Sequence, residues 1–187
     1  MGLDMYAHRR VYVKQWEHQK PEERYTVDIA RGGKPVAGIK PERISSVEEE
    51  VMYWRKANHI HAWFVDSVQK GIDNCAEYFV GEGALRELLS ACKEVIAGSK
   101  IVDGDMHTAS ETSRKHGLVE HREPRRVIED PTVAMETLPT RAGFFFGNTE
   151  YDGEYLDDVV RTQEWAERML EDRRNGVPGD IYYSSSW

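Results

Sequence analysis

At 187 residues, with 40% hydrophobic and 31% charged residues, the chain is long enough for one soluble domain with a substantial core. Its formal net charge of -8 argues against general nucleic-acid binding, because phosphate contacts require a basic face. The sequence contains no signal-peptide pattern and no apolar run near the length of a membrane span. We therefore expect a cytoplasmic protein with no membrane partner.

The first segment, residues 3–16, alternates apolar and polar residues as a half-buried strand does. A second strand is expected over 25–30, followed by a turn at Gly32-Gly33 and a short partner. The inward side of the first strand is small and aliphatic apart from Arg9, and its outward side is aromatic and basic. That outward side comprises Asp4, Tyr6, His8, Arg10, Tyr12, Lys14 and Trp16.

Residues 41–69 are expected to form a long helix that opens at Pro41. Residues three and four apart share a helix face, so Trp54, Asn58 and His61 are expected in the stripe that faces the core. An amide and an imidazole in that stripe must be hydrogen-bonded internally or must face a ligand. Both alternatives stay open at this point.

The middle of the chain is harder to interpret. A short strand is expected over 75–80 and a helix over 84–97, and the stretch 98–140 is polar and rich in Gly and Pro. We expect that stretch to hold a hairpin around Gly117 flanked by loop, serving as a functional flap or partly disordered. The chain is thus predicted to be a single domain, 1–187, with a loop- or hairpin-rich insertion at about 98–140.

The segment 143–147, Gly-Phe-Phe-Phe-Gly, is predicted to be a buried strand. Thr149 and Asp152 then provide the start of a helix from about 150 to 174, and 181–187 is expected to be a last strand. These elements predict an α+β fold. An antiparallel sheet of the terminal strands and the Phe strand would be packed by two long helices and one shorter helix.

No motif for catalysis, metal binding or a phosphate loop is present. His59 and His61 are two positions apart, about 200° around a helix, so they cannot share an ion. Cys75 and Cys92 lack the spacing of a zinc site. We expect no metal, no cofactor and no catalytic residue.

Four parts of the sequence are similar to segments of one family: Met1-Gly-Leu-Asp-Met-Tyr6, Tyr53-Trp-Arg-Lys-Ala-Asn58, Gly143-Phe-Phe-Phe-Gly147 with Thr149-Glu-Tyr-Asp152, and Tyr182-Tyr-Ser-Ser-Ser-Trp187. Through them the chain resembles a family of small uncharacterised bacteriophage and prophage proteins, over nearly its whole length except about 100–135. The resemblance carries no assigned chemistry and no functional residues. It implies a context in the host cytoplasm, where accessory phage proteins often inhibit host enzymes or sequester host signalling molecules.

The outward side of the first strand is a better candidate for a binding site than Asn58 and His61 in the helix stripe. Its aromatic side chains can stack on planar rings, and its basic side chains can neutralise phosphate. The alternative is a sheet face that helices cover. Arg55 and Lys56 are either solvated or form an anion clamp. We expect a pocket between that side and the helix segment 54–61. Its predicted residues are Tyr6, His8, Arg10, Tyr12, Trp16, Trp54, Arg55, Lys56, Asn58 and His61.

These residues favour a small-molecule binding protein that captures a phosphorylated or nucleotide-like ligand without turnover. One alternative is an acidic protein–protein inhibitor of a host factor that uses the helix 150–174. Another is a hydrolase with His61 as general base beside Glu150 or Asp152, although helix capping also accounts for these acids. Aromatic edges and the C-terminal strand permit a homo-oligomer without requiring one.

Overall fold

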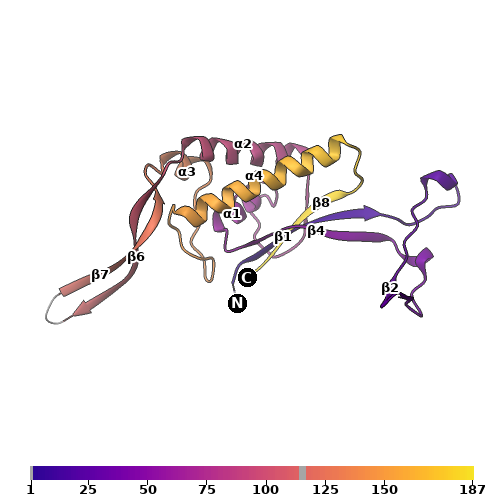
Figure 1. Ribbon diagram of the computed structural model, residues 1–187, viewed down its shortest axis with the longest axis horizontal. Helices are drawn as coiled ribbons and strands as arrows, with labels where there is room; N and C mark the ends of the chain where they lie inside the picture. Colours follow the sequence, from indigo (N-terminus) through magenta and orange to yellow (C-terminus); the bar gives the residue numbers. More distant parts are fainter. Residues whose placement is uncertain (1, 114–116) are drawn as a thin grey trace.

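In a computed structural model, the two ends of the chain pair as neighbouring strands of an antiparallel sheet (Figure 1). The structure describes residues 2–113 and 117–187, and side chains except those of 106–122. The strand order is β4-β1-β8-β5, and each neighbouring pair is antiparallel. The strands are β1 (Asp4–Tyr12), β4 (Ser46–Arg55), β5 (Tyr78–Val80) and β8 (Asp180–Ser186).

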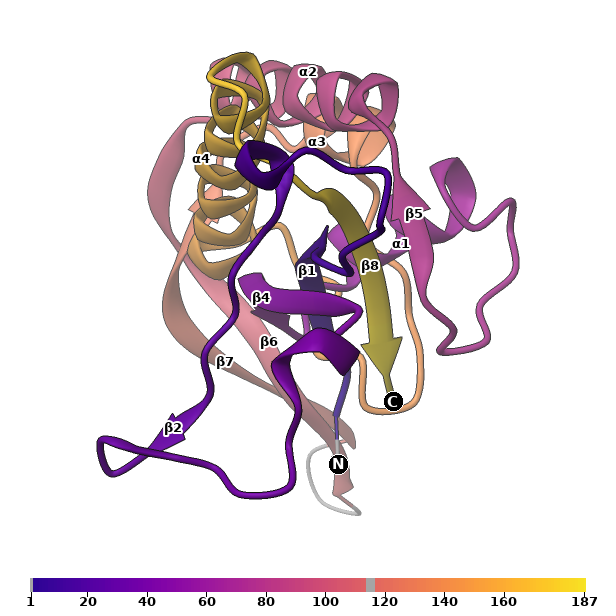
Figure 2. The ribbon, with the colours of Figure 1, turned by 90° about the vertical axis from the view of Figure 1, so that its right-hand side faces the viewer.

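The longer helices lie together on one side of this sheet, as two views at right angles show (Figures 1 and 2). None of the described helices has both the length and the apolar character needed to cross a bilayer. The helices are α1 (Asn58–Ser67), α2 (Glu82–Gly98), α3 (Thr132–Thr137) and α4 (Gly153–Arg174).

The core lies between the sheet and these helices. Alternation along β1 turns Met5 and Ala7 into it, and both side chains are fully buried. Trp54 of β4 lies at its centre, with its ring edge-on to Trp165 at a centroid distance of 5.2 Å. The indole N–H of Trp54 donates to Thr162 Oγ1 at 2.8 Å, so this buried polar atom is satisfied.

The predicted fold class is confirmed: a four-stranded antiparallel sheet packs against α1, α2 and α4. The terminal strands, the helix over 84–97 and the long C-terminal helix were predicted close to their observed bounds. Asp152 caps α4 as expected, since its Oδ1 accepts from the backbone N–H of Tyr155 at 2.9 Å.

The predicted helix 41–69 is wrong over its first half. Residues 46–55 form β4 and pair with β1 along the whole strand. Lys56 then takes a left-handed conformation, with φ of 61°, and α1 begins at Asn58. Pairing with β1 satisfies the β4 backbone and still buries Trp54, so tertiary context outweighs the helical spacing.

The predicted Phe strand is also wrong. Residues 143–147 form a turn, in which Phe145 and Gly147 have positive φ values of 70° and 92°. Phe144 is 83% exposed, and of the three rings only that of Phe146 is buried. A run of aromatic residues indicated burial, but the left-handed conformation of Phe145 breaks the strand geometry.

The stretch 98–140 holds a long hairpin and the short helix α3. Strands β6 (Ile101–Ser113) and β7 (Gly117–Ile128) pair antiparallel and reach away from the body of the protein (Figure 1). The two strands of the expected hairpin are thus present, and residues 114–116 between them lie outside the described residues. The predicted strand over 25–30 is mostly wrong, because only β2 (Ala30–Arg31) and β3 (Lys34–Pro35) pair there.

Candidate functional site

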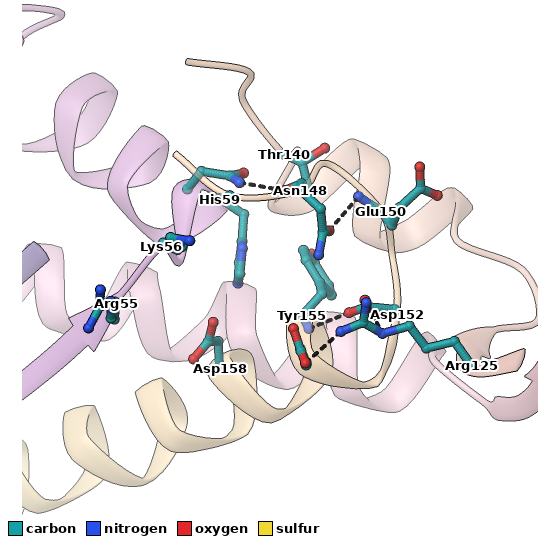
Figure 3. A pocket seen from close by; sticks show the side chains of 13 residues that line it. Arg55, Lys56, His59, Arg125, Thr140, Asn148, Glu150, Asp152, Tyr155 and Asp158 are labelled. Carbon is teal, nitrogen blue, oxygen red and sulfur yellow. Dashed lines mark hydrogen bonds and ion pairs between the residues drawn. The ribbon is translucent and has the colours of Figure 1, made fainter. Parts of the chain in front are cut away.

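A polar cavity of about 220 Å³ lies where the first turns of α1 and α4 approach the loop before α4 and strand β7 (Figure 3). Four separate segments of the chain therefore build it. Its lining residues are Arg55, Lys56, Asn58, His59, Arg125, Thr140, Gly147, Asn148, Glu150, Asp152, Glu154, Tyr155 and Asp158.

Asn58 fastens the loop that forms one wall of the cavity. Its side-chain amide donates to the backbone oxygens of Phe146 at 3.1 Å and Asn148 at 2.7 Å. Its carbonyl oxygen accepts from the backbone N–H of Arg141 at 2.9 Å. These three bonds satisfy the buried amide internally, which is the structural alternative of the two that the sequence left open.

Gly147 lets this loop approach the end of β4 closely. A Cβ at this position would lie 3.0 Å from Lys56 Cβ and 3.2 Å from the Lys56 carbonyl oxygen. Its φ of 92° is also one that side chains rarely adopt. Glycine therefore sets the distance between the loop and the cavity wall that Arg55 and Lys56 provide.

Arg55 and Lys56 bring positive charge to the cavity. Among the described residues, neither takes part in an ion pair. The N-terminus of α1 begins two residues further on and adds the partial positive charge of a helix end. This side of the cavity therefore favours an anion.

The opposite side carries carboxylates that are largely matched by arginine. Arg125 Nε lies 3.1 Å from Asp152 Oδ2, and its terminal nitrogen lies 2.5 Å from Glu154 Oε1. Asp152 is 1% exposed and also caps α4, so these contacts hold β7 against the start of that helix (Figure 3). Their first role is structural.

His59 points into the middle of the cavity between the two sides (Figure 3). It is 3% exposed, and its Nε2 has no hydrogen-bond partner among the described residues. Burial lowers its pKa to about 3, so the imidazole is neutral at pH 7. A cavity-lining residue whose buried ring nitrogen lacks a partner is a candidate contact for a ligand atom.

Asp158, one turn further along α4 than Glu154, also faces the cavity. Burial raises the pKa of its carboxyl to about 6, with the nearby charges of Glu154, Asp157 and Asp152 adding to the effect and Arg161 opposing it. Asp158 is therefore mostly ionised at pH 7 and can accept hydrogen bonds there.

The structure divides the ten predicted site residues among several places. Arg55, Lys56 and Asn58 line the cavity. Trp54 and His61 lie in the core instead. Tyr6, His8 and Arg10 lie on the sheet face away from the helices, beside Tyr53, Glu50 and Glu48 of β4. Tyr12 and Trp16, both about half exposed, lie at the end of β1 and beyond it.

The expected pocket between the outward side of β1 and residues 54–61 therefore does not form. Trp54 is paired with Met5 in the sheet and shares its buried side, whereas Tyr6 and Tyr53 share the opposite side. The sheet itself separates the two groups of residues, because neighbouring residues of a strand point to opposite faces.

His61 is a satisfied core residue. Its Nδ1 lies 2.7 Å from the Tyr183 hydroxyl and its Nε2 lies 3.0 Å from Asp73 Oδ2. Both ring nitrogens are thus taken by partners other than Glu150 and Asp152, the acids that a hydrolase would need beside this base.

Sequence reasoning missed His59, Asp158, Tyr155 and Arg125 as site residues. His59 was considered only as a metal ligand with His61, and Asp158 was not singled out. One sequence feature could have pointed to this site: the polar residues Asn148, Glu150 and Asp152 lie directly before the start of the helix α4. Within the described residues, no three His, Cys, Asp or Glu side chains are placed to hold a metal ion.

No family model, curated protein or solved structure matches this chain. Its function must therefore be inferred from the cavity and the surface themselves.

Proposed function

We propose that the protein captures a small phosphorylated, nucleotide-like molecule in the cavity without turning it over. The observation that carries this proposal is the polar cavity itself, whose wall includes Arg55 and Lys56, two cations with no ion pair among the described residues, and the buried His59, whose Nε2 has no hydrogen-bond partner among those residues. Arg55 and Lys56 on one side and Asp158 on the other give that cavity two chemically different ends.

The phosphate would bind at the side of Arg55 and Lys56. Arginine offers two parallel N–H donors to a phosphate, and lysine adds a mobile charge. The N-terminus of α1 favours an anion at the same place. Arg125 serves a different purpose, because Asp152 and Glu154 already hold it.

The other end of the ligand would meet His59 and Asp158. An ionised carboxylate and a neutral imidazole nitrogen accept hydrogen bonds, so they suit an exocyclic amino group such as that of adenine or cytosine. A cavity of about 220 Å³ limits the ligand to about the size of a mononucleotide. The ligand class that fits is therefore an amino-bearing nucleoside monophosphate or a molecule of similar shape.

Capture without turnover agrees with the groups present. Thr140 is an aliphatic hydroxyl in the lining, and it donates to the backbone oxygen of Thr149 at 3.0 Å and does not face a base. The low pKa of His59 leaves it without a proton to donate as a general acid at pH 7.

The resemblance to phage proteins adds a context to this proposal. A phage-encoded protein of this kind would act in the host cytoplasm and lower the free concentration of a host nucleotide signal. The alternative of an acidic inhibitor that uses α4 has less support from the geometry, since Glu167 is already paired with Lys93 at 2.8 Å.

A thermal-shift screen against AMP, CMP, IMP, UMP, inorganic phosphate and ADP-ribose tests the proposal, with each ligand recovered and checked for chemical change. We expect AMP or CMP to raise the melting temperature most and to be recovered intact. The double variant Arg55→Gln/Lys56→Gln should lose the shift, and the exposed control Arg86→Gln should keep it. A panel without any shift contradicts the proposal, and an altered ligand shows that the protein is an enzyme.

A further inference from the structure

The sheet face opposite the helices carries a row of rings that crosses all four strands. We call this row the aromatic row. Figure 1 shows the helices on the other side of the sheet. The cross-strand register aligns its members from one edge of the sheet to the other. They are Tyr53 of β4, Tyr6 and His8 of β1, Tyr182 of β8 and Phe79 of β5.

The rings of the aromatic row contact one another in two groups, one on β4 and β1 and the other on β8 and β5. Tyr6 lies 5.3 Å from Tyr53 and 6.0 Å from His8 between ring centroids. Phe79 lies 5.9 Å from Tyr182, and its side chain is 52% exposed. Ordinary sheets place polar residues on a solvated face, so rings on all four strands of one face indicate a surface for a partner.

Carboxylates surround the aromatic row. The register of β1 and β4 places Glu48 and Glu50 on this face beside Arg10 and His8. Glu77 precedes β5 at the other edge and reaches Arg10 as well. Asp4 accepts a hydrogen bond from the Tyr53 hydroxyl. The four acids outnumber the arginines of the face, Arg10 and Arg55, so phosphate groups of a nucleic acid would be repelled.

The face already binds one guanidinium in a defined way. The Arg10 guanidinium lies 4.5 Å above the centre of the Tyr182 ring. Its nitrogens donate to Glu48 at 2.6 and 3.0 Å and to both oxygens of Glu77 at 2.7 Å. Ring stacking combined with carboxylate pairing is the environment that arginine, more than lysine, prefers, because its charge is planar and forked.

We propose that this face docks an arginine-bearing segment of a basic protein partner. The partner's arginine would lie on Tyr6 or Phe79, as Arg10 lies on Tyr182, and Glu50 would pair with it. Glu50 is exposed and is available for this role. Apart from Arg55, which also lines the cavity, the surface is distinct from the cavity, so the protein would hold a small ligand and a protein partner on separate sites.

Calorimetric titration with hexa-arginine, hexa-lysine and a single-stranded DNA oligomer tests this proposal. We expect hexa-arginine to bind about tenfold more tightly than hexa-lysine, because stacking adds to charge pairing. Phe79→Thr should weaken hexa-arginine binding about fivefold or more. The same change at an exposed ring in the turn before α4, Phe144→Thr, should alter it less than about twofold.

A second pair of variants separates the face from the overall negative charge. Glu50→Gln and Glu87→Gln each remove one exposed carboxylate, but Glu87 lies on α2, away from the aromatic row. Only Glu50→Gln should weaken hexa-arginine binding. Equal binding of the two peptides, equal effects of the two glutamate variants, or tighter binding of the DNA would overturn the proposal. The melting temperature of each variant shows that its fold is retained.

Discussion

Two titratable side chains of the cavity, His59 and Asp158, are both held towards their neutral forms. Burial lowers the pKa of His59 from 6.5 to about 3 and raises the pKa of Asp158 from 3.8 to about 6. A base with a lowered pKa and an acid with a raised pKa have opposite effects on stability as the solution is acidified. The two side chains therefore make the free energy of unfolding depend on pH in a way that can be measured without knowing the ligand.

Asp158→Asn should make the free energy of unfolding fall more steeply on acidification. Below pH 6.5 the unfolded chain protonates His59 while the native state does not until about pH 3, so stability is lost as the pH falls. In the unaltered protein, native Asp158 takes up a proton below about pH 6, before the unfolded carboxyl does near 3.8, which offsets this loss. Urea unfolding at about pH 6 and about pH 4.5 gives the change in the free energy of unfolding per pH unit. This change should differ between Asp158→Asn and the unaltered protein by about 1 kcal/mol per pH unit.

The matched variant His59→Phe should change the slope in the other direction. It keeps a ring against Tyr155, whose centroid lies 4.2 Å from that of His59, and leaves Asp158 as the titrating group. Identical pH slopes for the two variants and the unaltered protein would contradict these assignments.

The buried hydrogen bond between Trp54 and Thr162 gives a second test at this scale. Thr162→Val keeps the shape of the side chain but leaves the indole N–H of Trp54 without its acceptor, at a cost of about 1–3 kcal/mol in the free energy of unfolding. In the background of Trp54→Phe, the same change should cost clearly less. Chemical denaturation of the four proteins checks this, and strictly additive effects would show that the bond contributes nothing.

Among the elements, those whose local pattern agrees with their tertiary surroundings could be predicted from the sequence. Strands β1 and β8 alternate because one face of the sheet is covered by helices, and α2 buries Leu85, Leu88, Cys92 and Val95 at helical spacing. The cap of α4 at Asp152 is a local signal as well. The fold class follows from these elements.

The β4 strand and most of the site could not be predicted in this way. The residues of β4 also fit the spacing of a helix face. Only their pairing with β1, more than 30 positions away in the sequence, selects a strand over a helix. The cavity joins side chains from four segments, whose proximity depends on that pairing and on the loop that Asn58 holds. Arg55, Lys56 and Asn58 could be named because polar residues interrupted an apolar pattern, whereas His59 and Asp158 resembled ordinary helix residues.

Gly147→Ala tests whether the loop before α4 shapes the cavity. The added Cβ would meet the backbone of Lys56 and would also require a strained φ, so we expect a loss of about 1–3 kcal/mol in stability and weaker ligand binding. Gly33→Ala is the control, because Gly33 has a φ of 75° but open space around its Cβ position. Denaturation and ligand-induced thermal shift should both be affected more by the first variant, and equal effects would contradict the role of the close approach.

At the scale of the whole molecule, two different chemical surfaces lie at different places. The cavity lies where α1 and α4 begin, and the aromatic row lies on the sheet face away from the helices. Arg55, the last residue of β4, is close to both the cavity and the aromatic row. It lines the cavity and lies opposite Asp4 in the sheet. Ligand capture and partner docking are therefore expected to be separable by mutation, apart from changes at Arg55.

Calorimetric titration of AMP into the unaltered protein and into Arg55→Gln/Lys56→Gln tests the central claim most directly. We predict saturable binding of one AMP per chain, weakened about tenfold or more by the double variant through loss of two phosphate contacts. IMP, which lacks the amino group, should bind about threefold to tenfold more weakly than AMP. Absence of binding by either nucleotide, or an affinity that the double variant leaves unchanged, would contradict a nucleotide site in this cavity.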